Sequence, residues 1–172
     1  ITDSVLAEIG PDFGRSYVLQ EGDLASFSCH ITGERANLML KKYRRKLGPS
    51  PASIKSARIG GIVANNASGS SYGIIHNSYH TMQSMRVILA DGFLLDSASE
   101  ESRKEFSRTY DSLLKGLLNL RKRVLDNPET AAKIRHKYEL KNTCGYGMNA
   151  LIDFEDPIDI LTHLMVGSEG TL

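Results

Sequence analysis

Four glycines and two adjacent asparagines lie within the segment 59–73, IGGIVANNASGSSYG. Glycine costs backbone entropy in a helix or strand and asparagine favours turns and caps, so this composition predicts a shaped loop. Gly60 and Gly61 would let the main chain approach a ligand without a Cβ, and N–H groups in such a turn can hold a phosphate or a polarised carbonyl. Further donors would come from the side chains of Asn65, Asn66 and Ser68. The alternative is a tight loop whose asparagines bond only to their own backbone, and the residues alone leave both interpretations open.

Other motifs with chemical potential lack the context that their chemistry needs. CGYGMNA, at Cys144–Ala150, imitates a dinucleotide fingerprint, but it follows polar HKYELKNT and precedes LIDFEDP instead of joining an apolar strand to a helix. We therefore reject a Rossmann site, and the absence of GxxxxGK[ST] excludes a P-loop. His76 and His80 lack the glutamate of HExxH, so local hydrogen bonding is the better interpretation. Ser70 and Ser71 lack the GxSxG context of a nucleophile.

Composition narrows the class of protein further. The chain has 172 residues, 41% of them hydrophobic, and 21 basic against 20 acidic side chains, which favours one domain and argues against nucleic acid as a partner. The run Lys41–Lys46 is interpreted as a solvated helix face. Cys29 and Cys144 stand alone, which predicts free thiols in a reducing, cytoplasmic compartment and no metal site. No apolar run is long enough to predict a transmembrane segment.

Hydrophobic periodicity and capping signals predict a mixed set of elements. Asp91 and Gly92 form a favoured two-residue turn within a hairpin, and Asn127 with Pro128 and Asp156 are good helix starts. A strand over 24–31 would place Ala25, Phe27, Cys29 and Ile31 on one face. The helix beginning at Glu34 has apolar positions at Leu38, Leu40 and Leu47 and ends at Gly48. The full set is strands around 17–21 and over 24–31, a hairpin over 85–98, and helices over 34–48, 102–125, 128–139 and 157–165. Hairpins and helices in mixed order indicate an α+β fold.

Four longer strings follow one another along the chain: GPSPASIKSARIGGIVANNASG (48–69), SMRVILADGFLLDSAS (84–99), IRHKYELKNTCGYGMNAL (134–151) and DPIDILTHLMVGSEGTL (156–172). Together they resemble the FAD-binding domain, of the PCMH type, of vanillyl-alcohol-oxidase-type flavoproteins. Within that family they are most similar to the D-lactate and D-2-hydroxyacid dehydrogenase branch. The resemblance spans roughly residues 1–172 and implies a mixed or antiparallel sheet flanked by helices.

The resemblance implies that FAD is the cofactor and that the glycine-rich backbone lies against it. Carried over position by position, it assigns to the cofactor Pro49, Ser53, Gly60, Gly61, Asn65, Asn66, Ser68, Gly69, Gly73, Glu169 and Gly170. Neighbours of that set are Asn142, Gly145 and Tyr146.

The same resemblance implies a partial domain. Relatives carry a phosphate loop of the RxxGTSxxG kind upstream of the match to ITDSVLAEIG, and a substrate-binding cap domain beyond Leu172, so we expect no catalytic residue in this chain and weak FAD binding by it alone. The full-length protein is expected to oxidise a D-2-hydroxyacid such as D-lactate by hydride transfer to flavin, with a separate electron acceptor. We expect the full-length protein to be cytoplasmic, and attachment to the surface of a membrane is left open. The alternatives are a flavin oxidase of the same fold acting on another alcohol or a sugar, and a non-catalytic nucleotide-binding module.

Overall fold

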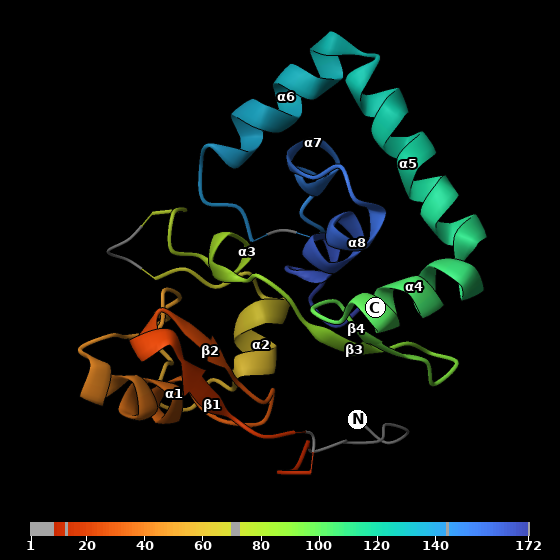
Figure 1. The fold of residues 1–172 in the computed structure, drawn as a ribbon. Coiled ribbons are helices and arrows are strands. Elements are labelled where there is room, and N and C mark those ends of the chain that lie inside the picture. Colours follow the sequence, from red (N-terminus) through yellow and green to blue (C-terminus); the bar gives the residue numbers. More distant parts are fainter. Residues whose placement is uncertain (1–8, 13, 70–72, 144, 172) are drawn as a thin grey trace, which may run out of the picture.

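A computed structural model describes residues 9–12, 14–69, 73–143 and 145–171 (Figure 1). The fold is α+β, as predicted, and in the part of the chain that the structure describes the sheets are two separate antiparallel pairs. In chain order the elements are β1 (Tyr17–Leu19), η1 (Gln20–Gly22), β2 (Leu24–Ser26), α1 (Gly33–Leu40), η2 (Lys41–Tyr43), α2 (Ile59–Ala64), α3 (Ser78–Thr81), β3 (Arg86–Ile88), β4 (Leu94–Asp96), α4 (Glu100–Thr109), α5 (Asp111–Leu125), α6 (Pro128–Tyr138), α7 (Ala150–Asp153) and α8 (Pro157–Met165).

The β1–β2 hairpin is confirmed, but β2 is much shorter than the predicted strand. Val18 pairs with Ala25, and β2 ends at Ser26. The chain then turns, with the Ile31 amide donating to the Ser28 carbonyl at 3.4 Å. The prediction of one apolar face running from Ala25 through Cys29 to Ile31 is therefore wrong, because the hydrogen-bonded pairing of β1 and β2 ends at Ser26.

The helix predicted over 34–48 ends eight positions early, at Leu40. One turn of 3-10 helix follows, and Arg44 then adopts a left-handed conformation with φ 58°. The Asn37 side chain accepts from the Leu47 amide at 2.8 Å, which folds the chain back over the helix. Leu40 is 4% exposed as predicted for a core position, whereas Leu38 is 56% exposed.

The first six residues of the glycine segment form a helix, so the prediction of a loop is wrong for 59–64. The start of α2 is held against the preceding chain, because the Ile59 amide donates to Ile31 O at 2.9 Å and the Gly60 amide to Cys29 O at 3.0 Å. A Cβ at Gly60 would lie 3.1 Å from the Cys29 Cβ, so glycine permits this close approach. These contacts, together with the burial of Ile62, offset the low helix propensity of adjacent glycines.

The β3–β4 hairpin is confirmed with a different turn. Leu89 and Phe93 form the last pair, since the Leu89 amide donates to Phe93 O at 2.9 Å, and the loop between them has three residues rather than two. Gly92 takes a left-handed φ of 89° at the third loop position, the geometry of a three-residue hairpin loop.

The helix predicted over 102–125 is two helices, α4 and α5, that break at Tyr110. The Tyr110 ring stacks on Phe106 with centroids 4.5 Å apart and meets Phe93 edge-on at 5.3 Å. Its hydroxyl donates to Asp91 in the β3–β4 loop. Tertiary contacts of Tyr110 thus bend a segment whose own pattern is continuous.

The last helices are confirmed at their predicted starts. The Asn127 side chain accepts from the Thr130 amide at 2.9 Å before Pro128, and Asp156 Oδ1 accepts from the Ile158 amide at 2.8 Å. Figure 1 shows α5 and α6 on the outside of α7 and α8, and α5 packs against all three of these helices. One apolar core joins α3 to α7 and α8, and a second lies between β4, α4, α5 and α8. Within the described residues, no helix is long and apolar enough to cross a membrane.

Candidate functional site

The C-terminal end of α2 is bonded to a turn a hundred positions later in the chain. The Gly167 amide donates to Val63 O at 3.1 Å, and the Glu169 amide donates to Ala64 O at 2.9 Å. The Asn65 side-chain amide donates to Glu169 Oε1 at 2.7 Å. Two segments that the sequence analysis selected separately therefore form one surface.

Residues on both sides of position 144, namely Asn142, Gly145 and Tyr146, join the same surface. The Asn66 side-chain amide donates to Asn142 O at 3.4 Å. A Cβ at Gly167 would lie 3.0 Å from Gly145 O, so the two backbones are almost in contact. The Tyr146 hydroxyl is 2.6 Å from Thr171 Oγ1.

The backbone of residues 49–50 lies against the end of the glycine-rich segment, at residues 68–69. The Ser50 amide donates to Ser68 O at 2.5 Å, and Pro49 is buried. Gly69 has φ 124°, and a Cβ there would lie 2.6 Å from Ser50 O. Only glycine fits this position without displacing the backbone.

Two residues of this surface adopt a conformation that is unusual for their type. Asn66 has φ 46° and Glu169 has φ 54°. Left-handed backbone at residues other than glycine carries a cost and occurs preferentially at functional sites. Both residues belong to the set assigned to the cofactor by resemblance, and they lie on facing turns.

A comparison with protein families decides the class of site. Residues 15–97 match the model of a family described as FAD binding domain. The match supports an FAD-binding domain of the PCMH type. FAD is the cofactor of this domain, and the family supports a flavin-dependent oxidoreductase module. No curated protein and no solved structure matches this sequence.

The segment that matches the family model ends just after β4, at Ser97, and contains α2 and its glycine-rich turn. The 142–146 and 166–171 segments lie outside the match. Their hydrogen bonds to Val63, Ala64 and Asn66 attach them to the matched segment at its glycine-rich turn.

Local features of the glycine-rich turn and the segments bonded to it fit a bound cofactor. Ser68 is 2% exposed, and among the described residues its hydroxyl has no hydrogen-bond partner. Such an unpaired buried polar atom needs an explanation, and a ligand provides one. Open space, with nothing within 4 Å of a notional Cβ, surrounds Gly61, Gly73, Gly145 and Gly170.

Some residues assigned by resemblance lie apart from this surface. Ser53 is exposed in a turn whose amides at Ser56 and Ala57 donate to its carbonyl, beside α1 rather than the α2 turn. Gly60 faces Cys29, and its amide is already bonded there. Gly73 is exposed with φ 54° and follows residues 70–72, which lie outside the described residues, as does Cys144.

Sequence reasoning missed the contribution of α3 to the site. The Ser78 hydroxyl donates to Ile62 O at 3.1 Å, and the Tyr79 amide donates to Asn66 Oδ1 at 3.0 Å. Asn77 caps α3, accepting from the His80 amide at 2.8 Å, and it also bonds the His80 ring at 2.8 Å. The local role predicted for His80 is thus confirmed. In the sequence, the helix-capping Asn77 of NSYH was the available signal for α3. Nothing in the local sequence indicates that α3 contacts Asn66.

Burial determines the protonation behaviour of two side chains next to the site. Burial, and then the Asp153 carboxylate, raise the pKa of the Tyr79 hydroxyl well above its usual range. Burial lowers the pKa of His163, whose Nδ1–H donates to Asp159 O at 2.8 Å and whose ring stacks on Phe154 with centroids 3.9 Å apart. Both groups are therefore neutral near pH 7. No metal-binding cluster is found among the residues that the structure describes.

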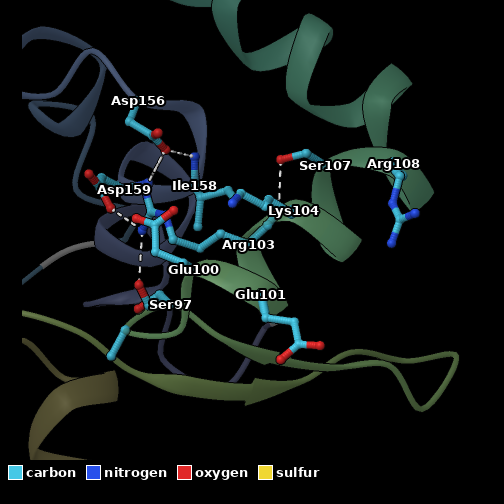
Figure 2. A pocket seen from close by; sticks show the side chains of 11 residues that line it. Ser97, Glu100, Glu101, Arg103, Lys104, Ser107, Arg108, Asp156, Ile158 and Asp159 are labelled. Carbon is cyan, nitrogen blue, oxygen red and sulfur yellow. Dashed lines mark hydrogen bonds and ion pairs between the residues drawn. The ribbon is translucent and has the colours of Figure 1, made fainter.

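A large hollow lies away from this surface, between α4 and the start of α8 (Figure 2). Arg103 spans it, with ion pairs of 2.8 Å to Asp156 and to Asp159 and a hydrogen bond of 3.0 Å to Ser97 O. Its rim also carries both signs of charge, including Glu101 and Arg108. The Arg103 side chain is bonded to groups of the protein itself, so it is not free to hold a ligand in this hollow.

Proposed function

We propose that this chain is the FAD-binding part of a flavin-dependent dehydrogenase that oxidises a D-2-hydroxyacid such as D-lactate. The observation that carries the proposal is the convergence of the α2 turn, the 142–146 segment and the 166–171 turn within and beside the segment that matches the FAD binding domain. Support for the substrate comes from the four ordered strings that resemble the D-2-hydroxyacid branch.

The backbone of the three segments is suited to lie against the cofactor. Gly61, Gly145 and Gly170 present main chain without a neighbouring side chain. The Ser68 hydroxyl is buried and has no partner among the described residues, so a phosphate or ring oxygen that came within reach would satisfy it. Asn65 and Glu169 hold the facing turns at a fixed separation through their hydrogen bond.

Bound FAD would supply the acceptor for the hydride, with its two electrons, that leaves the substrate carbon. The residues described here would bind and orient the cofactor and exclude water from one side of it. The proposal gives none of the described residues a role in substrate positioning or proton removal.

Flavin content and substrate oxidation together test the proposal in the complete natural protein. The purified protein is expected to show a flavin spectrum and to release FAD on denaturation, and D-lactate is expected to bleach that spectrum under anaerobic conditions. L-Lactate is the matched control, because it differs only in the configuration of the reacting carbon.

The outcomes separate the cofactor from the substrate. Bleaching by an aryl alcohol or a sugar, and by neither lactate, would contradict the D-2-hydroxyacid and favour another oxidase of this fold. A protein that neither contains nor takes up FAD would contradict the whole proposal and favour a non-catalytic module.

A further inference from the structure

Both ends of the Asn66 side-chain amide are bonded within the protein. Oδ1 accepts from the Tyr79 amide at 3.0 Å, and Nδ2 donates to Asn142 O at 3.4 Å. Asn66 is 9% exposed and left-handed. Because the left-handed residue that makes the turn is the one whose side chain is bonded at both ends, the hydrogen bonds that hold this side chain also hold the turn.

Tyr79 connects Asn66 to the helical half of the fold, by which we mean helices α4 to α8. Its ring is buried and meets Phe154 and His163 edge-on, with centroids 6.1 and 5.1 Å apart. Its hydroxyl donates to Asp153 Oδ2 at 2.8 Å. One residue therefore bonds the α2 turn through its backbone and α7 through its side chain.

Asp153 fixes the far end of this connection. It is the last residue of α7, a helix that packs against α5 and α8. The same Oδ2 atom also accepts from Asn149 Nδ2 at 3.0 Å. Because Tyr79 remains protonated across the physiological range, its hydroxyl is a permanent donor to this carboxylate.

We infer that Asp153 is a positioning residue for the cofactor site, acting through Tyr79 to hold Asn66 and the left-handed turn that follows α2. The inference rests on the proposed function for the identity of the ligand. It gives the helical half, which lies beyond the matched segment, a defined role in shaping the site.

Site-resolved amide hydrogen exchange in the complete natural protein, without added FAD, tests the positioning itself. The amides to follow are those of Tyr79, Gly167 and Glu169, which bond Asn66 Oδ1, Val63 O and Ala64 O. Asp153→Ala is expected to speed their exchange about tenfold, because Tyr79, the residue that bonds Asn66, loses its hydrogen bond to a charged group, and to leave the amides of α4 unchanged. Equal acceleration of all slow amides, or none, would overturn the inference.

Two variants sharpen the comparison. Asp153→Asn is expected to restore slow exchange, because both hydrogen bonds go to a single oxygen that asparagine retains. Tyr110→Phe is the matched control, since it removes another tyrosine-to-aspartate hydrogen bond, to Asp91, remote from the turn. Acceleration at Tyr79 in Tyr110→Phe, or no rescue by Asp153→Asn, would count against a specific role for Asp153.

Titration of the same variants with FAD tests whether the positioning of Asn66 by Asp153 affects the affinity for the cofactor. Asp153→Ala is expected to raise the Kd for FAD about tenfold, and Tyr110→Phe to leave it unchanged. An unchanged Kd in Asp153→Ala would overturn the role in the cofactor site. A wild-type protein that binds no FAD would contradict the proposed function instead, and the exchange data would still decide whether Asp153 positions Asn66.

Discussion

The side-chain amide of Asn65 donates to the carboxylate of Glu169 across 104 positions of sequence, at 2.7 Å. This contact joins the glycine-rich turn of the segment that matches the FAD binding domain to the last turn of the described chain. Backbone bonds from Gly167 and Glu169 run beside it. The relationship shows that the two turns act as one surface.

We expect Asn65→Asp to weaken this surface. The substitution keeps the shape of the side chain but places a carboxylate against that of Glu169, and a lost exposed hydrogen bond with added repulsion costs about 1 kcal/mol. Thermal unfolding should show a lower Tm. The double variant Asn65→Asp with Glu169→Gln should recover it, because a donor and an acceptor face each other again. Equal stability of Asn65→Asp and wild type would contradict the coupling.

Gly61→Val is expected to abolish FAD retention in a protein that remains folded. Nothing lies within 4 Å of a Cβ at Gly61, so the side chain would enter open space that we assign to the cofactor. Gly60→Val is the informative comparison, because its Cβ would meet Cys29 at 3.1 Å and should lower stability with or without FAD. The measurements are flavin content and urea unfolding, and normal flavin content in Gly61→Val would refute the assignment.

The inner side of the β3–β4 hairpin is expected to contribute to stability and not to cofactor binding. Leu89 is half-buried against the core that contains Leu95, whose side chain is fully buried. Leu95→Ala should cost about 2–5 kcal/mol, Leu89→Ala less, and Ile88→Ala little because Ile88 is exposed. Urea unfolding of the FAD-free protein measures the series. Unchanged stability of Leu89→Ala would contradict its burial.

Stability is expected to fall as pH decreases below 6.5, the ordinary pKa of histidine, in part because of His163. Its folded-state pKa is lowered, so in that range the unfolded chain binds a proton that the folded chain does not, which favours unfolding by up to about 1.4 kcal/mol per pH unit. The groups around the ring oppose this lowering of the His163 pKa without cancelling it: they are the backbone of Asp159 and Met82 and the carboxylates of Asp159 and Asp153.

His163→Phe tests that pH dependence because it keeps a ring against Phe154 without a titrating group. The slope of unfolding free energy against pH should flatten below pH 6.5 in this variant, although its stability at pH 7 is lower from the lost hydrogen bond to Asp159 O. An unaltered slope in His163→Phe would show that another group is responsible.

The sequence was sufficient to predict an element wherever a few neighbouring residues determine the conformation of the backbone. Asn127 with Pro128, and Asp156, begin helices because their side chains satisfy the first free amides of the same helix. The β3–β4 hairpin follows from two apolar runs around an aspartate and a glycine, and only its loop length differed. The resemblance carried by four strings selected the cofactor before any geometry was known.

Tertiary contacts determined where the helices α2, α4 and α5 form and end. The adjacent glycines of α2 favour a loop by themselves, yet bonds to Cys29 and Ile31 and the burial of Ile62 make them helical. The continuous pattern over 102–125 breaks because the Tyr110 ring is held by Phe106 and the β3–β4 loop.

The partners of Asn66 show most clearly what the sequence cannot determine. The sequence by itself determined that Asn66 is a residue able to take a left-handed turn and to offer a donor and an acceptor. Only the tertiary structure decided that these groups bond Tyr79 and Asn142. The physical reason is that a side-chain hydrogen bond between distant segments depends on how the cores between them pack, and no local pattern encodes that distance.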